Sequence, residues 1–266
     1  MNEWNPAGKH LSAQEKDRLR QAAEILLRAR RERTPVAALP EDLAPHDLDE
    51  AYALQSIVAE ALGPVQGWKV GAPSPEAMPL FSAMPAWGGF TPSGAHVSEH
   101  FRRLRGVEGE IAFLIGSDLP PRSTPYTREE VIAAIASAHP AIELLESAFE
   151  DPDKTPRFST IGDLQSNGGF IYGAALEGWQ SVDLTRESVS VVIDGVVRFG
   201  GTASNSAGTD LLRLVTYLAN EGSYRTGGLR AGDWVTTGSW SGKELALPGS
   251  RVDVEFSTFG TVTLHF

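Results

Sequence analysis

Apolar residues recur at helical spacing in two stretches near the N-terminus. A capping box at residues 12–15 precedes apolar positions over residues 19–26, and the pattern stops near Pro35. Residues 47–50 repeat the capping pattern ahead of a second apolar face that ends at Gly63-Pro64. Two helices are therefore expected. We interpret the arginines of the first helix as a solvated face rather than a site for an anionic partner. These arginines are Arg18, Arg20, Arg28, Arg30, Arg31 and Arg33.

Beyond Gly63 the pattern changes to short β-forming runs separated by Gly, Pro and Asn. Strands are expected over residues 68–70, 107–115, 188–199, 234–237, 251–256 and 261–266. The 188–199 run reads as a hairpin, because Asp194-Gly195 suits a type I′ turn. Further helices are expected over residues 127–138 and 211–218. Pro140 is expected to separate the 127–138 helix from the apolar run 141–145.

Helices and strands do not alternate regularly, which disfavours a doubly wound parallel sheet. The predicted fold class is α+β, with a mixed and mostly antiparallel β core. The predicted division is a helical N-terminal arm over residues 1–64 and a catalytic domain over residues 65–266. A chain of 266 residues can bury a sizeable core.

Composition and charge narrow the function. The formal net charge is −11, which disfavours a nucleic-acid binder because such proteins need a basic surface. The chain has no cysteine, so disulfides and thiolate metal sites are excluded. No signal-peptide pattern and no apolar run near the roughly 20 residues of a membrane span are present. A soluble, cytoplasmic protein is expected.

Three glutamates carry the most informative chemistry. Glu108 and Glu110 open the apolar run 107–115, where alternation would direct both side chains to one face. Glu143 lies inside the apolar run 141–145. Carboxylates in buried surroundings repel one another unless a cation lies between them, and hard divalent cations prefer oxygen ligands. The alternative is that the pair lies at a strand's solvated end and Glu143 at the wet edge of a helix.

Four segments in order along the chain resemble the fumarylacetoacetate hydrolase superfamily, in its branch of 2-oxopent-4-enoate hydratases and 4-oxalocrotonate decarboxylases. The first is the Gly-aromatic-Lys-aliphatic-Gly block with the residues that follow it, and the second is the Glu-x-Glu motif. The third carries a later glutamate, and the fourth is a late Thr-Gly. These segments are residues 67–78, 107–112, 140–143 and 234–238.

The resemblance implies a mixed β-sandwich or roll core and a homodimer or larger assembly. It implies Mg²⁺ or Mn²⁺ on Glu108, Glu110 and Glu143, and a small 2-oxo or 2-hydroxydienoic acid as substrate that reacts through a metal-chelated enolate. Hydration in aromatic catabolism is the leading expectation. Decarboxylation, acylpyruvate-type C–C hydrolysis and a non-catalytic partner subunit are the alternatives.

The resemblance also assigns residues around the substrate. Lys69 is expected to be catalytic, binding the substrate carboxylate or moving a proton, whereas a strand lysine commonly reaches solvent. Ser166 matches a position that contacts the substrate, although its segment also fits an ordinary Gly-rich turn. Thr237 and Gly238 match the Thr-Gly that closes the substrate pocket.

Three departures from the family pattern concern the pocket rather than the metal ligands. Ala86 stands where the hydratases usually carry an acid, and Leu164 stands where they carry Asn. Thr209-Asp210 replaces a common His-Pro pair. Either the substrate or the reaction is therefore expected to differ from that of the hydratases.

Two other motifs are set aside. The segment 96–100 fits the H-x-x-E-H pattern of a zinc peptidase, but it lies in a connection rather than on a helix. The segment 237–243 resembles a phosphate loop, yet Gly238 and Gly242 are too close and Glu244 occupies the position of the required Ser or Thr.

Overall fold

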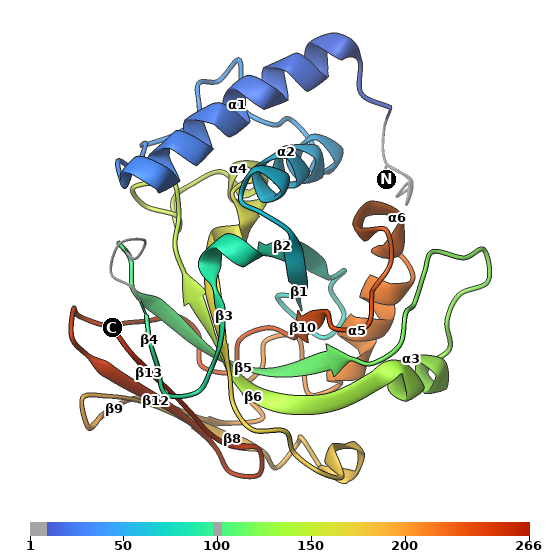
Figure 1. The fold of residues 1–266 in the computed structure, drawn as a ribbon, viewed down its shortest axis with the longest axis vertical. Coiled ribbons are helices and arrows are strands. Elements are labelled where there is room, and N and C mark those ends of the chain that lie inside the picture. Colours follow the sequence, from blue (N-terminus) through green and yellow to red (C-terminus); the bar gives the residue numbers. More distant parts are fainter. Residues whose placement is uncertain (1–9, 98–102) are drawn as a thin grey trace.

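The computed structural model describes residues 10–97 and 103–266, and its two N-terminal helices lie together at one end (Figure 1). Helix α1 spans Ala13–Glu32 and helix α2 spans Leu48–Ala61. Both helices and the capping box at the start of α1 confirm the sequence prediction. Asp47 caps α2 through the Glu50 N–H, while the Glu50 carboxylate accepts the His46 N–H and pairs with Arg18.

The larger sheet carries the predicted carboxylate strand at its centre. Within the described residues it has eight strands in the order β2-β1-β10-β5-β6-β7-β3, with β11 paired to β5. The strands are β1 Val65–Gly71, β2 Leu80–Pro85, β3 Phe90–Pro92, β5 Gly106–Ile115, β6 Ile135–Leu145, β7 Asn167–Tyr172, β10 Trp234–Thr236 and β11 Glu244–Leu245. The pairs β1–β10 and β3–β7 are parallel, and the others are antiparallel.

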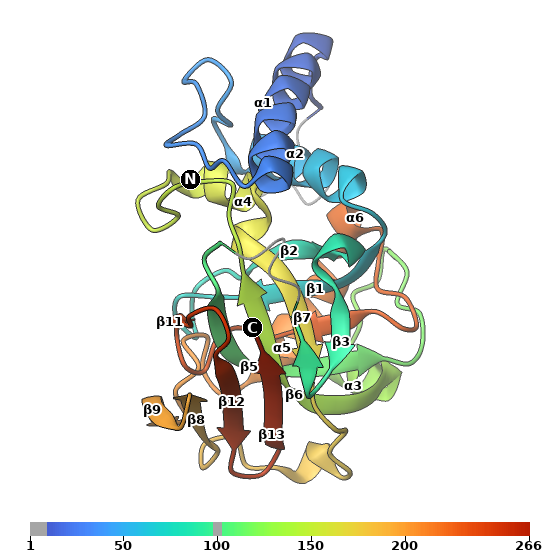
Figure 2. The ribbon, with the colours of Figure 1, turned by 60° about the vertical axis from the view of Figure 1, so that its left-hand side comes forward.

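The second sheet has five strands in the described part of the chain, in the order β4-β13-β12-β8-β9. They are β4 Ala95–His96, β8 Ser188–Ile193, β9 Val196–Thr202, β12 Arg251–Phe256 and β13 Gly260–His265. Asp194 and Gly195 have φ of 52° and 78°, as the predicted hairpin turn requires. Figure 2 shows this sheet below the helical end. Its buried side chains share one core with those of β5 and β6, which confirms the α+β class with two mixed sheets.

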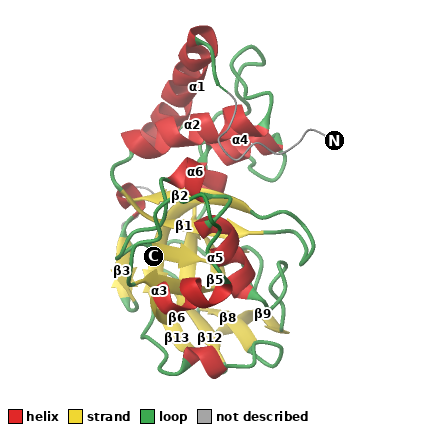
Figure 3. Cartoon of the chain, turned by 90° about the vertical axis from the view of Figure 1, so that its right-hand side faces the viewer, coloured by secondary structure: helices red, strands yellow, loops and turns green. Residues whose placement is uncertain are grey.

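Short helices complete the fold (Figure 3). They are α3 Arg128–Ala134, α4 Arg157–Gly162, α5 Leu211–Ala219 and α6 Ser223–Thr226, with 3-10 turns η1 Ala86–Gly88, η3 Leu164–Ser166 and η4 Trp179–Ser181. No described helix is long and apolar enough to span a bilayer. His96 lies in strand β4 rather than a helix, and Ser98–His100 of the H-x-x-E-H motif lie outside the described residues.

The prediction for residues 127–145 was wrong in part. Helix α3 ends at Ala134, and Pro140 lies inside β6 instead of separating two elements. Pairing with the long strand β5 continues back to Ile135, and this ladder outweighs local helical preference. Pro140 is tolerated because the β6–β7 ladder ends one residue later, at Ala141, so the missing N–H interrupts no pair there.

The solvated-face interpretation was wrong for Arg30. Its side chain is buried and its Nε lies 2.6 Å from Oδ1 of Asp163, while its other donors reach main-chain oxygens of Glu146, Asp163 and Asn167. Burial of an arginine requires such complete pairing. The other arginines of this helix face are exposed or, for Arg18, half-buried.

The N-terminal arm and the rest of the chain share buried surface. Leu26 of α1 and Leu54 of α2 lie in one apolar cluster with Phe149 and Leu164. The Arg30–Asp163 pair joins the same regions. The division at residue 64 remains a proposal.

Candidate metal centre

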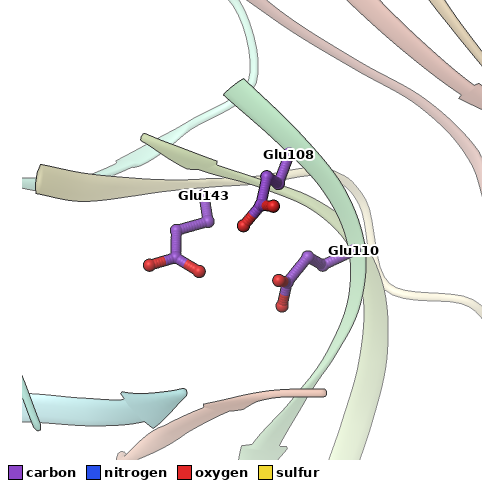
Figure 4. Close-up of side chains that lie close together, drawn as sticks. All are labelled: Glu108, Glu110 and Glu143. Carbon is purple, nitrogen blue, oxygen red and sulfur yellow. The ribbon is translucent and has the colours of Figure 1, made fainter. Parts of the chain in front are cut away.

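Adjacent strands bring the three predicted glutamates together. Glu108 and Glu110 are two residues apart on β5, and Glu143 on β6 is paired directly with Glu108. One carboxylate oxygen from each residue lies within 4.8 Å of those from the other two. Figure 4 shows the three carboxyl groups pointing into the same space. The alternation inferred for the Glu-x-Glu pair therefore holds, and Glu143 joins it through the sheet register.

Neighbouring side chains hold Glu143 in place from two directions. Lys69 Nζ on β1 lies 2.8 Å from Glu143 Oε1, and Asn167 Nδ2 on β7 donates to the same oxygen at 2.9 Å. The lysine ammonium also donates to the main-chain oxygen of Gln165 at 3.2 Å. The other oxygen of Glu143, Oε2, is buried and has no hydrogen-bond partner among the described residues.

Glu110 is held by the end of β10. The Thr236 hydroxyl and the Gly238 N–H, at 3.1 Å, both donate to Glu110 Oε2. Donors that fix a carboxylate in this way commonly surround metal ligands in proteins. This oxygen is therefore oriented, and the second oxygen of Glu110 is left for another partner.

Burial and mutual repulsion set the electrostatics of the cluster. Burial raises the pKa of the Glu108 carboxyl despite the nearby Lys69. Burial raises the pKa of Glu110 well above its ordinary value, and the charges of Glu143 and Glu108 raise it further. Burial alone would lower the pKa of Lys69, but Glu143, Glu108 and Glu110 together raise it, so the lysine stays cationic.

This donor set fits a hard divalent cation. Three carboxylates share one space, and among the described residues Lys69 is the cationic side chain that forms an ion pair with them, so the cluster carries excess negative charge in buried surroundings. The orphaned Glu143 Oε2 supplies a ligand atom that hydrogen bonding does not use. A bound cation would offset the desolvation cost that raises the carboxyl pKa values.

A cavity of about 280 Å³ opens beside the cluster. Its wall includes Lys69, Glu108 and Ser166, and this volume suits a small organic acid. A larger cavity of about 540 Å³ lies elsewhere, between α2 and the β1–β2 pair, and is mainly apolar. We assign the chemistry to the smaller cavity because only that one adjoins the carboxylates.

The loop carrying Ser166 has an unusual backbone. Leu164, Gln165 and Ser166 have φ values of 59°, 47° and 62°, a left-handed run that L residues rarely adopt. This turn aims the Gln165 carbonyl at Lys69 and brings Ser166 to the cavity wall. Strained backbone of this kind concentrates at functional sites.

No model of a known protein family matches the chain. The chain is 26% identical over 261 residues to a 2-keto-4-pentenoate hydratase from Paraburkholderia xenovorans, covering 92% of this chain and 94% of that protein. Its fold matches 4-oxalocrotonate decarboxylase from Pseudomonas putida G7, complexed with magnesium and adipate, with a TM-score of 0.78, 22% identity and coverage of 97% and 100%. It also matches a putative fumarylacetoacetate hydrolase family protein from Yersinia pestis, with a TM-score of 0.54, 21% identity and coverage of 76% and 93%.

The chain therefore has the fold of fumarylacetoacetate hydrolase family proteins and is similar to the hydratase along nearly its whole length. This similarity confirms the resemblance drawn from the four sequence segments. The three departures from the family pattern leave the cluster of three glutamates intact. Leu164 packs into the apolar cluster beneath α1 and α2, and the Ala86 N–H donates to Pro64 O. Asp210 precedes α5 and pairs with Arg128.

The two remaining predicted substrate contacts are close to the glutamates. The Thr237 hydroxyl is buried and donates to Ile111 O at 2.6 Å, and the Gly238 N–H donates to Glu110 Oε2. Their direct contact with substrate stays a prediction.

Sequence reasoning did not select several residues that contact the cluster or line the cavity. Thr236 directly precedes the predicted site residue Thr237, and Asn167 directly follows Ser166. The polar character of these neighbours was the sequence signal that could have marked them as site residues. Asp153 and Lys243 line the cavity as well. Lys243 ends the segment that resembles a phosphate loop, whereas no local pattern marks Asp153.

Proposed function

We propose that the protein is a divalent-metal-dependent hydratase acting on a small 2-oxo or 2-hydroxydienoic acid. The observation that carries this proposal is the cluster of Glu108, Glu110 and Glu143 beside a cavity lined by Lys69. Similarity to the 2-keto-4-pentenoate hydratase, which extends over nearly the whole of both chains, supports hydration as the reaction.

Glu108, Glu110 and Glu143 would hold the cation, for which Mg²⁺ or Mn²⁺ is proposed because both prefer oxygen ligands. When bound, the cation would supply Lewis-acid stabilisation of negative charge developing on the 2-oxo oxygen. Thr236 and Gly238 would keep Glu110 oriented during turnover.

Lys69 is the proposed acid–base and anchoring residue. Its ammonium is held between Glu143 and the Gln165 carbonyl, so its position is defined before substrate enters. From the cavity wall it can bind the substrate carboxylate or donate a proton to the carbon skeleton during water addition. Ser166, in the same wall, is proposed to donate a hydrogen bond to the substrate.

Decarboxylation is the second candidate reaction. It is favoured by the fold match with 4-oxalocrotonate decarboxylase over the entire length of that chain. Leu164 stands where the hydratases carry Asn, and it lies in an apolar cluster. No polar side chain at this position can therefore orient water. C–C hydrolysis and a role as a non-catalytic partner subunit are the remaining alternatives.

One assay separates these possibilities. The purified chain is incubated with the monoacid 2-keto-4-pentenoate or with the diacid 4-oxalocrotonate. Each incubation contains either Mn²⁺ or EDTA, and the products are identified by mass. Water gain in Mn²⁺ but not in EDTA supports the hydratase, and CO₂ release from the diacid supports the decarboxylase. Absence of turnover on both, with Mn²⁺ bound, would overturn the hydratase and decarboxylase proposals. An acylpyruvate added to the same assay then separates C–C hydrolysis from a non-catalytic partner subunit.

Further proposals rest on the same resemblance. We propose a homodimer or larger homo-oligomer, residues 1–64 as a helical arm on a catalytic domain of residues 65–266, and a place in aromatic catabolism in the cytoplasm. Sedimentation analysis of the purified chain tests the first of these.

A further inference from the structure

A second lysine lines the cavity that holds Lys69. Lys243 lies in the wall together with Lys69 and Glu108. Its side chain is 30% exposed, whereas that of Lys69 is 14% exposed, so Lys243 is the more open of the two cations. The proposed hydratase reaction on a monoacid uses one cation and the metal, and gives this second lysine no role.

The sheet register explains why Lys243 lies beside the metal centre. Strand β11 pairs antiparallel with β5, with Glu244 opposite Val107. Lys243 precedes Glu244, so it projects beside Glu108 on the same face as that ligand. Its positive charge lowers the pKa of Glu108, although burial outweighs this effect.

The loop that carries Lys243 is pinned to the sheet. Ser241 Oγ accepts the Gly109 N–H at 2.9 Å, and the Trp240 N–H donates to the Gly109 carbonyl at 2.8 Å. Gly242, with φ of 68°, makes the turn into β11. The base of the lysine is therefore fixed, while its long side chain can adjust.

An exposed carboxylate holds the ammonium of Lys243 in this structure. Lys243 Nζ pairs with Asp153 Oδ2, and the Asp153 side chain is 74% exposed. An exposed ion pair of this kind contributes little free energy, so a ligand carboxylate can compete with Asp153 or share the ammonium. Asp153 also lines the cavity.

Apolar side chains complete the same wall. Leu104, Leu145 and Pro152 line the cavity with the two lysines. A carbon chain with one carboxylate near Lys69 and the metal and another near Lys243 could therefore also contact apolar surface in this cavity.

We propose that Lys243 is a specificity-determining residue that binds a second, distal carboxylate, so that the substrate is a 2-oxo dicarboxylic acid. This inference rests on the proposed function, because it names the substrate class of that same site. Lys69 and the metal bind the 2-oxo acid end, and Lys243 binds the far end. Asp153 holds the Lys243 ammonium at the cavity until substrate arrives.

The test compares a 2-oxo-4-enoic monoacid with the matching 2-oxo-4-enedioic acid in the metal-loaded enzyme. We expect wild type to favour the diacid in kcat/KM. Lys243→Met should lower the diacid-to-monoacid ratio by on the order of 10- to 100-fold, the effect of one charge-assisted hydrogen bond. Lys243→Arg should restore most of it. Lys154→Met is the matched control, because Lys154 forms an exposed pair with Asp151 close by in the chain and should leave the ratio unchanged.

A binding measurement keeps this test separate from the proposed reaction. Calorimetric titration of the Mn²⁺-loaded protein with glutarate and with butanoate reports distal carboxylate binding without turnover. Asp153→Asn should tighten glutarate binding several-fold, and Lys243→Met should abolish the preference for glutarate. Turnover with an unchanged ratio in Lys243→Met would overturn this inference alone. Absent turnover with glutarate preference intact would overturn the proposed function and leave the distal site supported.

Discussion

Glu108 and Glu143 lie directly opposite each other in the antiparallel pair of β5 and β6. Directly opposed carboxylates repel, and a sheet normally avoids that arrangement. Here the Glu143 side chain is fully buried, one of its oxygens is bound by Lys69 and Asn167, and the other has no partner within the described residues. This arrangement supports the proposal that Glu108 and Glu143 are two ligands of one cation.

Replacing Glu143 by Gln should remove metal binding. The amide keeps the shape of the side chain but loses its charge, and it leaves the Lys69 ammonium without its carboxylate partner. Mn²⁺ affinity should therefore fall by at least about 100-fold, which is more than the loss expected when a residue that only contacts a ligand is replaced. Mn²⁺ titration followed by electron paramagnetic resonance measures this. Glu255→Gln, on the exposed face of β12, is the control. Equal Mn²⁺ affinity in the two variants would refute the site.

Thr236→Val should weaken the metal site without removing a ligand. It deletes the hydroxyl that orients Glu110, and loss of such outer contacts costs about 10- to 100-fold in metal affinity. Thr263→Val is a matched control. The Thr263 hydroxyl donates to Asp253, and both residues lie on the five-stranded sheet, which does not carry the three glutamates. The same Mn²⁺ titration should show a loss only for Thr236→Val. Comparable losses in both would point to a general effect on folding instead.

The metal-free protein should become less stable as pH rises above the ordinary pKa of glutamate, 4.5. Burial raises the pKa of folded Glu110 well above that value, so the folded chain keeps a proton that the unfolded chain has lost. The contribution of Glu110 to stability is therefore fully present below pH 4.5 and is lost as pH rises through the folded pKa. Thermal unfolding in EDTA across pH 4.5 to 8 measures this.

Two comparisons check that Glu110 is the titrating group. Glu110→Gln should flatten the pH dependence of the metal-free protein, because it removes the carboxyl that titrates. Mn²⁺ at about 100 times its Kd should stabilise wild type by about 2.7 kcal/mol and stabilise the variant far less. A pH profile that Glu110→Gln leaves unaltered would show that another group causes the loss of stability.

Lys69→Met should abolish turnover while leaving metal in place. Loss of an acid–base group lowers kcat by about 10²- to 10⁴-fold. Mn²⁺ should still bind, since the three carboxylates remain. Lys16→Met, on the exposed side of α1, serves as the control. Normal kcat in Lys69→Met would remove this residue from the mechanism.

Arg30→Met should destabilise the fold strongly. It leaves the buried Asp163 carboxylate without its ion partner, which costs about 3–5 kcal/mol. Arg28→Met, on the exposed face of the same helix, should change stability by less than about 0.5 kcal/mol. Urea unfolding of both variants measures the difference. Similar midpoints would mean that the buried pair contributes little.

Local rules within the sequence determined a large part of this structure. Capping residues and helical spacing located α1 and α2, and Asp194-Gly195 located the β8–β9 turn, because these signals act over a few residues. Strand alternation alone placed Glu108 and Glu110 on one face. Ordered resemblance across the chain added Glu143 and Lys69 to the expected site.

Only the tertiary structure decided the rest. The register of β5 on β6 put Glu143 opposite Glu108 and drew residues 135–138 out of the predicted helix. Burial of Arg30 depended on Asp163, far away in the chain. Lys243 reached the cavity through the pairing of β11 with β5. Such placements minimise the free energy of the whole fold, and no window of sequence contains the partners that determine them.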